Sequence, residues 1–540
     1  MTSPLIADPA ETGDILVEAP VPIPHDGAIS HDVAKHVVGG TSALSLGVFL
    51  ERGAGFAANI LAARFAGSST FGAYALGIST ANNISTYAAG GIGSTAVRFS
   101  GKYPYGSAGY TTLARALVIV STVSALIAML ALWLGAQPIA HLLHKESLTT
   151  MLRWAALSAG GMILLECARG FFVGQRRLVA LVLLSVIVGI GMLTLLPVTA
   201  AMHRPTHMIV AQGAVTCAAV AICLLFATRL GVAPRSSPIA ALPLLPMLRE
   251  VWGFGVVQLA GLIGANLAGW WLTALVARSD TTLVQMSFFA IASQLRNLAG
   301  IAPGLLTEGS YAVMANPDEA SRTPHRIMAL CTYASTSVVL LVSACGILLS
   351  PWALRAMYGT AYTHAVTTAT VALAVAVVHM GNAPAAARLT IVSIKAAGII
   401  NTVWAIFVAL SATIFLFHGG SATEAMAILF AGHAVSAALV LAVLSKKDFV
   451  PSGMVPLFAV ATVSISALAT LSVLRERMQS AGSTTMWMAL IFFGTCASLL
   501  ALGKRYHWVP SRVAARRMLT SLRSAVQGIL PRGKRRLHAV

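Results

Sequence analysis

The residues of this sequence that could do chemistry are charged side chains inside long apolar stretches. The stretch LGVFLERGAGFAANILAARF (residues 46–65) carries Glu51 and Arg52 side by side near its middle and Arg64 near its end. A later apolar stretch carries Arg296 near its middle. A charge at the centre of a membrane-spanning helix costs about 2.5–3.5 kcal/mol on insertion scales, so it is usually retained for a function. Because the planar guanidinium suits two oxygens of a phosphate, these arginines indicate anion binding if the stretches cross a membrane.

The composition of the chain indicates that they do cross one. Of the 540 residues, 57% are hydrophobic and 10% are charged, with a mean hydropathy of +0.81. A soluble protein needs roughly 25% charged residues to cover its surface. Apolar runs of about 20 residues, long enough for a hydrocarbon core of about 30 Å, recur along the chain. They predict an all-α polytopic membrane protein with about fourteen transmembrane helices, at 38–66, 71–97, 112–140, 150–173, 178–202, 207–231, 250–277, 283–315, 327–354, 364–388, 396–417, 423–445, 455–474 and 483–503.

The runs divide into two lobes of six helices and two further helices. The segments FGAYALGISTANN (71–83) and VQMSFFAIASQLRN (284–297) resemble one another, which places Asn83 opposite Arg296. An even number of helices in each half makes this a parallel repeat. The expected segments are a disordered acidic tail (1–36), an N-lobe (37–231), a cytoplasmic linker (232–249), a C-lobe (250–445), two extra helices (446–503) and a basic tail (504–540).

Lysine and arginine gather in alternate connections, and this sets the expected orientation. Basic residues follow the even-numbered runs, as at Arg176 and Arg177 or at Lys446, whereas connections such as AGSST and RSDTT are poor in them. By the positive-inside rule, both termini are cytoplasmic. The connection after the third run departs from the pattern because it carries Lys145 and Arg153.

The two tails and the cysteines suggest no cofactor. The acidic, proline-rich start lacks the basic and apolar regions of a signal peptide. The basic end predicts contact with anionic lipids of the inner leaflet rather than with nucleic acid, because no nucleic-acid-binding fold accompanies the charge. The six cysteines stand singly without a C-x-x-C motif, so the sequence supports neither a metal site nor a disulfide framework.

Two segments resemble those of a known family. LAARFAGSSTFGAYALGISTANNISTYAAGGIGSTAVRFSGKY is similar to the opening of the polysaccharide-type flippases of the multidrug/oligosaccharidyl-lipid/polysaccharide exporter superfamily. LLSPWALRAMYGTAYTHA (348–365) is similar to the segment that joins their ninth and tenth helices, and the resemblance covers about residues 37–445. The matching elements of the opening lie at 61–67, 71–76, 90–93 and 97–98.

The resemblance implies a transporter rather than an enzyme. Such proteins flip polyprenyl-pyrophosphate-linked oligosaccharides to the outer leaflet of the bacterial cytoplasmic membrane for exopolysaccharide, capsule or O-antigen assembly, beside a polymerase and chain-length machinery. The family's seventh helix often carries an aspartate where this chain reads NLAGWW (266–271), so an ion role for that carboxylate does not carry over. The open alternatives are a multidrug or ion-coupled efflux transporter of the same superfamily, a lipid II flippase and a membrane glycosyltransferase or polymerase. The last usually needs a large extramembrane loop, which this chain lacks.

The implied substrate requires a hydrated, cationic cavity, because an isolated charge in a low dielectric costs tens of kcal/mol. Arg52 and Arg296 belong to different lobes and are expected to face each other across a central cleft. Glu166 and Arg169, at i and i+3, are expected to form a local ion pair. Further candidates for substrate binding are Arg64, Arg98, Asn59, Asn83, Gln294 and Asn297, and the candidates for proton or ion coupling are Glu51 and Glu308.

Structural roles compete with these functional ones. Glu51 and Arg296 could neutralise each other instead of meeting a substrate or a proton. Arg64 and Arg98 lie near run ends, where long side chains reach lipid headgroups. Asparagine and glutamine also bond helix to helix in lipid, so the amides could be structural.

Overall fold

The computed structural model describes residues 50–508, apart from 104, 106, 226–242, 315–322, 447–448 and 479–480. This part of the chain is helical and contains no strand. The helices are 50–66, α2 (Ser68–Ala89), α3 (Ile92–Lys102), α4 (Ala108–Leu142), α5 (Thr149–Gly174), α6 (Leu178–Ala200), α7 (Pro205–Leu225), α8 (Leu244–Ser279), α9 (Val284–Ala299), α10 (Ile301–Met314), α11 (Thr323–Tyr358), α12 (Val366–Val392), α13 (Ile394–Leu416), α14 (Ala422–Ser445), α15 (Met454–Met478) and α16 (Ala481–Arg505), with short 3-10 turns at Glu146–Leu148 and Thr360–Ala365.

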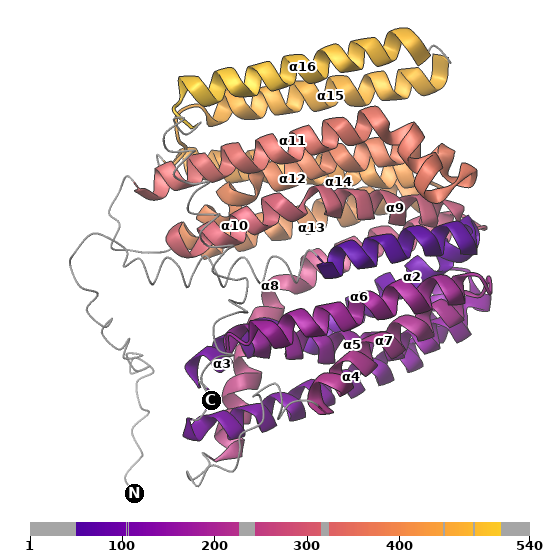
Figure 1. The fold of residues 1–540 in the computed structure, drawn as a ribbon, viewed down its shortest axis with the longest axis vertical. Helices are drawn as coiled ribbons and strands as arrows, with labels where there is room; N and C mark the ends of the chain where they lie inside the picture. Colours follow the sequence, from indigo (N-terminus) through magenta and orange to yellow (C-terminus); the bar gives the residue numbers. More distant parts are fainter. Residues whose placement is uncertain are drawn as a thin grey trace, which may run out of the picture.

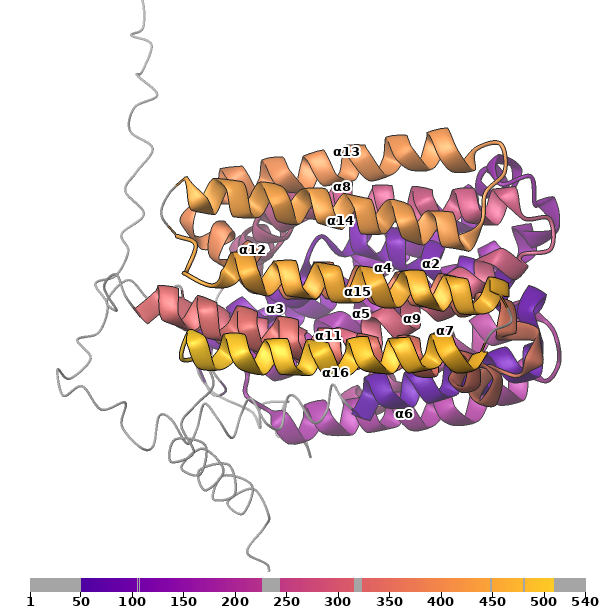
Figure 2. The ribbon, with the colours of Figure 1, turned by 90° about the horizontal axis from the view of Figure 1, so that it is seen from above.

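The helices form one elongated bundle in which the two lobes lie side by side (Figure 1). In Figure 1 the N-lobe, from residue 50 to α7, occupies the indigo-to-magenta half, and α9 to α14 of the C-lobe occupy the other, while α8 packs against both. Figure 2 shows that most helices follow a common direction, and Figure 1 shows α15 and α16 at the top edge of the bundle. These last two helices pack on α11 and α12 of the C-lobe. The predicted all-α polytopic membrane fold is therefore confirmed.

The predicted apolar runs all correspond to helices. Within the described residues, ten helices are long and apolar enough to cross a membrane by length and composition. The other four runs correspond to 50–66, α2–α3, α8 and α9–α10. These four carry many of the polar residues around the interior cavities described below. The helices with the weakest membrane signal therefore face water-accessible space instead of lipid alone.

Two predicted runs are each divided into two helices. The run 71–97 breaks between α2 and α3, where Gly90 and Gly91 have φ values of 50° and 70°. Two consecutive left-handed residues cannot continue a right-handed helix, and glycine adopts this conformation most readily. The run 283–315 breaks at Gly300, between α9 and α10. The two breaks fall in the second helix of each lobe, which agrees with the predicted correspondence of these segments.

The helix α8 joins the lobes and begins earlier than predicted. It starts at Leu244, six residues inside the expected linker, because Pro246 lies in its first turn, where a missing N–H costs little. Its indoles reach both lobes: Trp270 Nε1 donates to Thr80 of α2 at 3.2 Å, and Trp271 Nε1 donates to Thr413 of α13 at 2.9 Å. The expected acidic tail, most of the linker and most of the basic tail lie outside the described residues.

Candidate functional site

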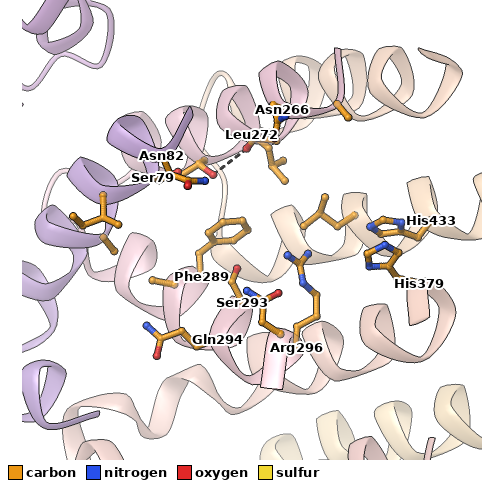
Figure 3. Close-up of a pocket in the computed structure, with 18 of the residues that line it drawn as sticks. Ser79, Asn82, Asn266, Leu272, Phe289, Ser293, Gln294, Arg296, His379 and His433 are labelled. Atoms are coloured by element: carbon orange, nitrogen blue, oxygen red, sulfur yellow. Dashed lines mark hydrogen bonds between the residues drawn. The ribbon is translucent and has the colours of Figure 1, made fainter. Parts of the chain in front are cut away.

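A cavity of about 850 Å³ lies between the two lobes (Figure 3). Its walls come from α2, α8, α9, α12, α13 and α14, with single residues of helix 50–66 and of α5, α6 and α7. Its polar lining consists mostly of uncharged side chains that both donate and accept hydrogen bonds. They are the amides Asn59, Asn82, Gln212, Asn266, Gln294, Asn297, Asn382 and Asn401, and the hydroxyls of Tyr74, Ser79, Thr273, Ser293 and Ser436.

The full charge among the described residues of this lining comes from an arginine. Arg296 stands in the last turn of α9 and extends into the cavity (Figure 3). Its guanidinium forms no ion pair or hydrogen bond with any other described residue, and no aspartate or glutamate is among the described residues of the lining. A half-buried charge with no partner among the described residues is costly, so this arrangement is suited to an anionic ligand.

Two histidines that the sequence reading missed lie beside Arg296. His379 of α12 and His433 of α14 stack with ring centroids 4.3 Å apart and an interplanar angle of 19°. Trp404 of α13 packs on His433 at 5.3 Å. Figure 3 shows both imidazoles at the same side of the cavity as the guanidinium. The available signal was a single histidine in each of two apolar runs, AVAVVHMGNA and LFAGHAVSAA, since ionisable residues in such runs are functional candidates.

A second cavity, of about 540 Å³, lies between helix 50–66 and α9–α10. Arg52 and Glu308 line it, and Glu308 is exposed. It shares three lining residues with the central cavity, so these mark the junction of the two: Asn59, Gln294 and Asn297. The prediction that Arg52 and Arg296 face each other across one cleft is therefore wrong in detail: the two arginines line adjoining cavities.

Glu51 faces the interior of the N-lobe. Its carboxylate accepts a hydrogen bond from Arg169 Nη2 of α5 and another from Ser185 Oγ of α6 at 3.1 Å. Arg169 also lies 3.7 Å from Glu166, as expected for that i, i+3 pair. The suggested ion pair between Glu51 and Arg296 is therefore not formed. Adjacent positions on a helix point about 100° apart, so Glu51 faces away from the second cavity, which is lined by Arg52.

Three other predicted binding residues lie outside both cavities and make contacts between helices. Arg64 Nη1 donates to the carbonyl of Ala356 at 2.9 Å. The guanidinium of Arg98 lies 4.6 Å from the ring centroid of Phe254. The buried Asn83 donates through Nδ2 to the carbonyl of Asn266 at 2.9 Å, and the preceding residue, Asn82, lines the cavity instead.

The lobes meet at the end of the bundle where α2 and α9 begin, at the right in Figure 1. Ser69 Oγ donates to the carbonyl of Thr282 at 2.6 Å, and Tyr362 donates to the carbonyl of Ala63 at 3.2 Å. The backbone of α2 approaches the turn before α9 so closely that a Cβ on Gly72 would overlap the carbonyl oxygen of Leu283. This end of the central cavity is therefore closed by contacts between the lobes.

Two helical lobes around a polar cavity define the chain as a membrane transporter in fold. The structure is similar to a lipid II flippase, MurJ, in an inward-closed conformation, with a TM-score of 0.61 and 13% identity over 86% of this chain and 98% of that one. It is also similar to an inward-facing multidrug resistance MATE transporter of the MOP superfamily, with a TM-score of 0.56 and 14% identity over 76% of this chain and 95% of that one.

The family of the chain follows from its sequence. Residues 37–308, just over half of the chain, match the model of the polysaccharide biosynthesis protein family, and the chain belongs to that family. The sequence matches no curated protein. The family and the fold are those of flippases and exporters, which confirms the resemblance drawn from the sequence.

Proposed function

We propose that the protein carries polyprenyl-pyrophosphate-linked oligosaccharides from the inner to the outer leaflet of a bacterial cytoplasmic membrane. The cavity opens alternately to the two sides, both termini are cytoplasmic, and the product enters exopolysaccharide, capsule or O-antigen assembly. Membership of the polysaccharide biosynthesis family and the flippase-type fold support this class of substrate.

The composition of the central cavity carries the proposal. An oligosaccharide presents many hydroxyl groups, each of which donates and accepts hydrogen bonds, and carboxamides match both roles. The cavity combines such amides with the unpaired guanidinium of Arg296. An uncharged sugar attached to a diphosphate needs this combination, because its polar groups must be rebound and its charge balanced when it leaves water.

The second cavity supplies a route for the lipid. Its walls are helix 50–66 and α9–α10, which belong to different lobes, and its lining includes Leu298, which is 39% exposed. A polyprenyl chain can remain in the bilayer beside this gap while its sugar occupies the central cavity. Arg52 then stands on the lipid side of the junction and Arg296 on the sugar side.

Drug efflux coupled to a cation is supported less well. Organic cations and coupling protons favour acidic residues, and the described lining of the central cavity contains none. The acid of the first helix, Glu51, is neutralised by Arg169. Glu308 lies in the second cavity and remains the better candidate for coupling. Lipid II is also a saccharide linked to a polyprenyl diphosphate, so its flipping would require the same binding of a diphosphate as the leading proposal.

Partners follow from this function. The anionic lipids of the inner leaflet would hold the basic tail, and the polymerase with its chain-length machinery would receive the product at the outer leaflet. Neither contact needs a cofactor.

The test is transport in a strain that makes a lipid-linked repeat unit but lacks its own flippase. Expression of this chain should restore polymer and make the lipid-linked repeat accessible to a lectin from outside. Arg296→Gln should abolish both at unchanged protein level. Arg355→Gln, at an exposed arginine of α11 outside both cavities, is the matched control and should transport normally. The proposal would be contradicted if the wild-type chain were present in normal amounts and the lipid-linked repeat still remained inaccessible to the lectin, for each of several repeat structures. Rescue of a lipid II flippase depletion would instead assign lipid II as the substrate.

A further inference from the structure

Among the described residues that line the central cavity, the positively ionisable side chains all belong to the C-lobe wall. Arg296, His379 and His433 come from α9, α12 and α14, three helices that are far apart in the chain. The N-lobe wall contributes amides, hydroxyls and apolar groups, and its single ionisable side chain is the phenol of Tyr74. The two walls therefore differ in the kind of group that they can bind.

The two imidazoles are held in place by aromatic packing. The rings of His379 and His433 stack at 4.3 Å, and the ring of Trp404 packs against His433 with a centroid distance of 5.3 Å and an interplanar angle of 38°. The backbone beside the pair is also tightly packed, since a Cβ on Gly432 would lie 2.9 Å from Val408 and 3.2 Å from Trp404. Side chains positioned in this way lose little entropy when a ligand binds.

The three side chains of this cluster line the cavity, and their nitrogen atoms have no partner among the described residues. Neither histidine forms a hydrogen bond or an ion pair with another described residue, and His379 is exposed although it stands inside the fold. A neutral imidazole always offers one N–H donor, and a guanidinium offers five. Three side chains with converging donors and no described acid beside them suit a group that only accepts, such as a phosphate or carboxylate oxygen.

We propose that Arg296, His379 and His433 form one anion-binding subsite that holds an oxyanion of the transported molecule against the C-lobe. The oxyanion is the diphosphate linkage or the carboxylate of an acidic sugar, and the amides of the N-lobe wall hold the uncharged sugars. This assignment rests on the proposed transport of a lipid-linked oligosaccharide. It means that the charge of the substrate moves with the C-lobe when the lobes change their relative position.

Binding of soluble probes tests the subsite without requiring transport. The full chain in lipid nanodiscs is titrated with farnesyl diphosphate, with inorganic pyrophosphate, with glucuronate and with farnesol. We expect both diphosphates to bind, farnesol to bind more weakly, and Arg296→Gln to weaken diphosphate binding about tenfold or more. Glucuronate could instead bind more tightly than either diphosphate and lose this binding in Arg296→Gln. That result would support the subsite and would identify the bound oxyanion as the carboxylate of an acidic sugar.

Substitutions of the histidines separate hydrogen bonding from packing. His379→Phe and His433→Phe keep a stacking ring but remove the donors, and should weaken diphosphate binding about fivefold. His379→Asn keeps a donor and should bind more tightly than His379→Phe. His364→Asn, at an exposed histidine in the turn Thr360–Ala365, is the matched control and should bind as the wild type does.

Two results would overturn the subsite. One is wild-type affinity for diphosphate in both phenylalanine variants, which would leave the histidines as packing residues between α12 and α14. The other is the absence of binding of every anionic probe by the folded wild-type chain. If transport of lipid-linked sugars fails while diphosphate binding is present and depends on these residues, the subsite stands and the transported molecule differs from the one proposed.

Discussion

Arg169 of α5 binds the Glu51 carboxylate of the first described helix inside the N-lobe, and Ser185 of α6 donates to the same carboxylate. The two ionic side chains are 28% and 20% exposed, respectively. The pair therefore connects two helices of the N-lobe in a poorly hydrated place. Glu166 adds a second carboxylate next to the same guanidinium.

The first prediction is that this pair is structural. Glu51→Gln or Arg169→Gln alone leaves a charge without its partner, and breaking a buried pair in this way costs about 3–5 kcal/mol. We expect each single variant to be less abundant and to unfold at a lower temperature in detergent. The double variant should recover most of the stability and of the transport. A stable double variant without any transport would show instead that Glu51 has a coupling role.

The sequence predicted the helices well, because a hydrocarbon core of about 30 Å imposes one length on every crossing segment. It predicted the charged residues but not their partners. Glu51 and Arg52 are neighbours in sequence, yet they face Arg169 and the second cavity, respectively. The direction in which each points depends on the rotation of its helix against others that are distant in the chain. A single sequence carries no record of that rotation.

The same limitation explains the residues that the sequence reading missed. His379 and His433 lie in different apolar runs and become a recognisable pair only when α12 and α14 pack together. Asn82 and Asn83 are of the same type, and the helix rotation alone sends one into the cavity and the other toward α8. The sequence therefore shows which polar and ionisable residues lie in the apolar runs. Which of them come together in one site depends on how the helices pack.

The second prediction uses these two neighbouring asparagines. Asn82→Ala removes a cavity amide and should lower transport severalfold, with normal abundance and thermal stability. Asn83→Ala removes a hydrogen bond between α2 and the backbone of α8, and should destabilise the protein by about 0.5–1.5 kcal/mol. Transport per folded molecule and the unfolding temperature are measured for both. If Asn82→Ala destabilised the protein and Asn83→Ala lowered transport per folded molecule instead, the assignment of Asn82 to the binding site would be wrong.

The third prediction concerns closure of the end at which the lobes meet. Gly72→Val places atoms where the carbonyl of Leu283 lies, so the lobes can no longer close there. We expect Ser69, replaced by cysteine, to react faster with a water-soluble thiol reagent in this variant, and transport to be lost. Gly53→Val, at a helical glycine with open space around it, is the control and should leave labelling and transport unchanged. Equal labelling rates in both variants would show that this contact does not control closure.

The fourth prediction is the orientation of the connections. Thr281 lies at the closed end of the bundle, where its carbonyl accepts a hydrogen bond from Lys145. The nearby Ser279 donates to the carbonyl of Gly420, just before α14. Lys446 lies at the other end of α14. Reporter fusions at these two positions should therefore report opposite sides of the membrane, with Lys446 in the cytoplasm. The same side for both fusions would contradict the arrangement of the helices, and exchanged sides would reverse the proposed direction of insertion.

The last prediction separates the two arginines of the adjoining cavities. If Arg52 lies on the lipid path and Arg296 in the anion subsite, the two should affect different measurements. Arg52→Ala should slow the transport of a lipid-linked sugar while soluble pyrophosphate still binds within about twofold of wild type. Arg296→Ala should remove both. The parallel measurements are leaflet accessibility of the lipid-linked sugar in proteoliposomes and pyrophosphate affinity in nanodiscs.

Conservative replacements make this comparison sharper. A lysine keeps the positive charge but loses the planar fork that holds two oxygens at once. Arg296→Lys should therefore recover only part of the pyrophosphate affinity, whereas Arg52→Lys should recover most of the transport if that position needs charge alone. An equal loss of pyrophosphate binding in Arg52→Ala and Arg296→Ala would place both guanidinium groups on the same anion. The junction residues Asn59, Gln294 and Asn297 would then surround the diphosphate itself, and the division between a sugar cavity and a lipid path would have to be abandoned.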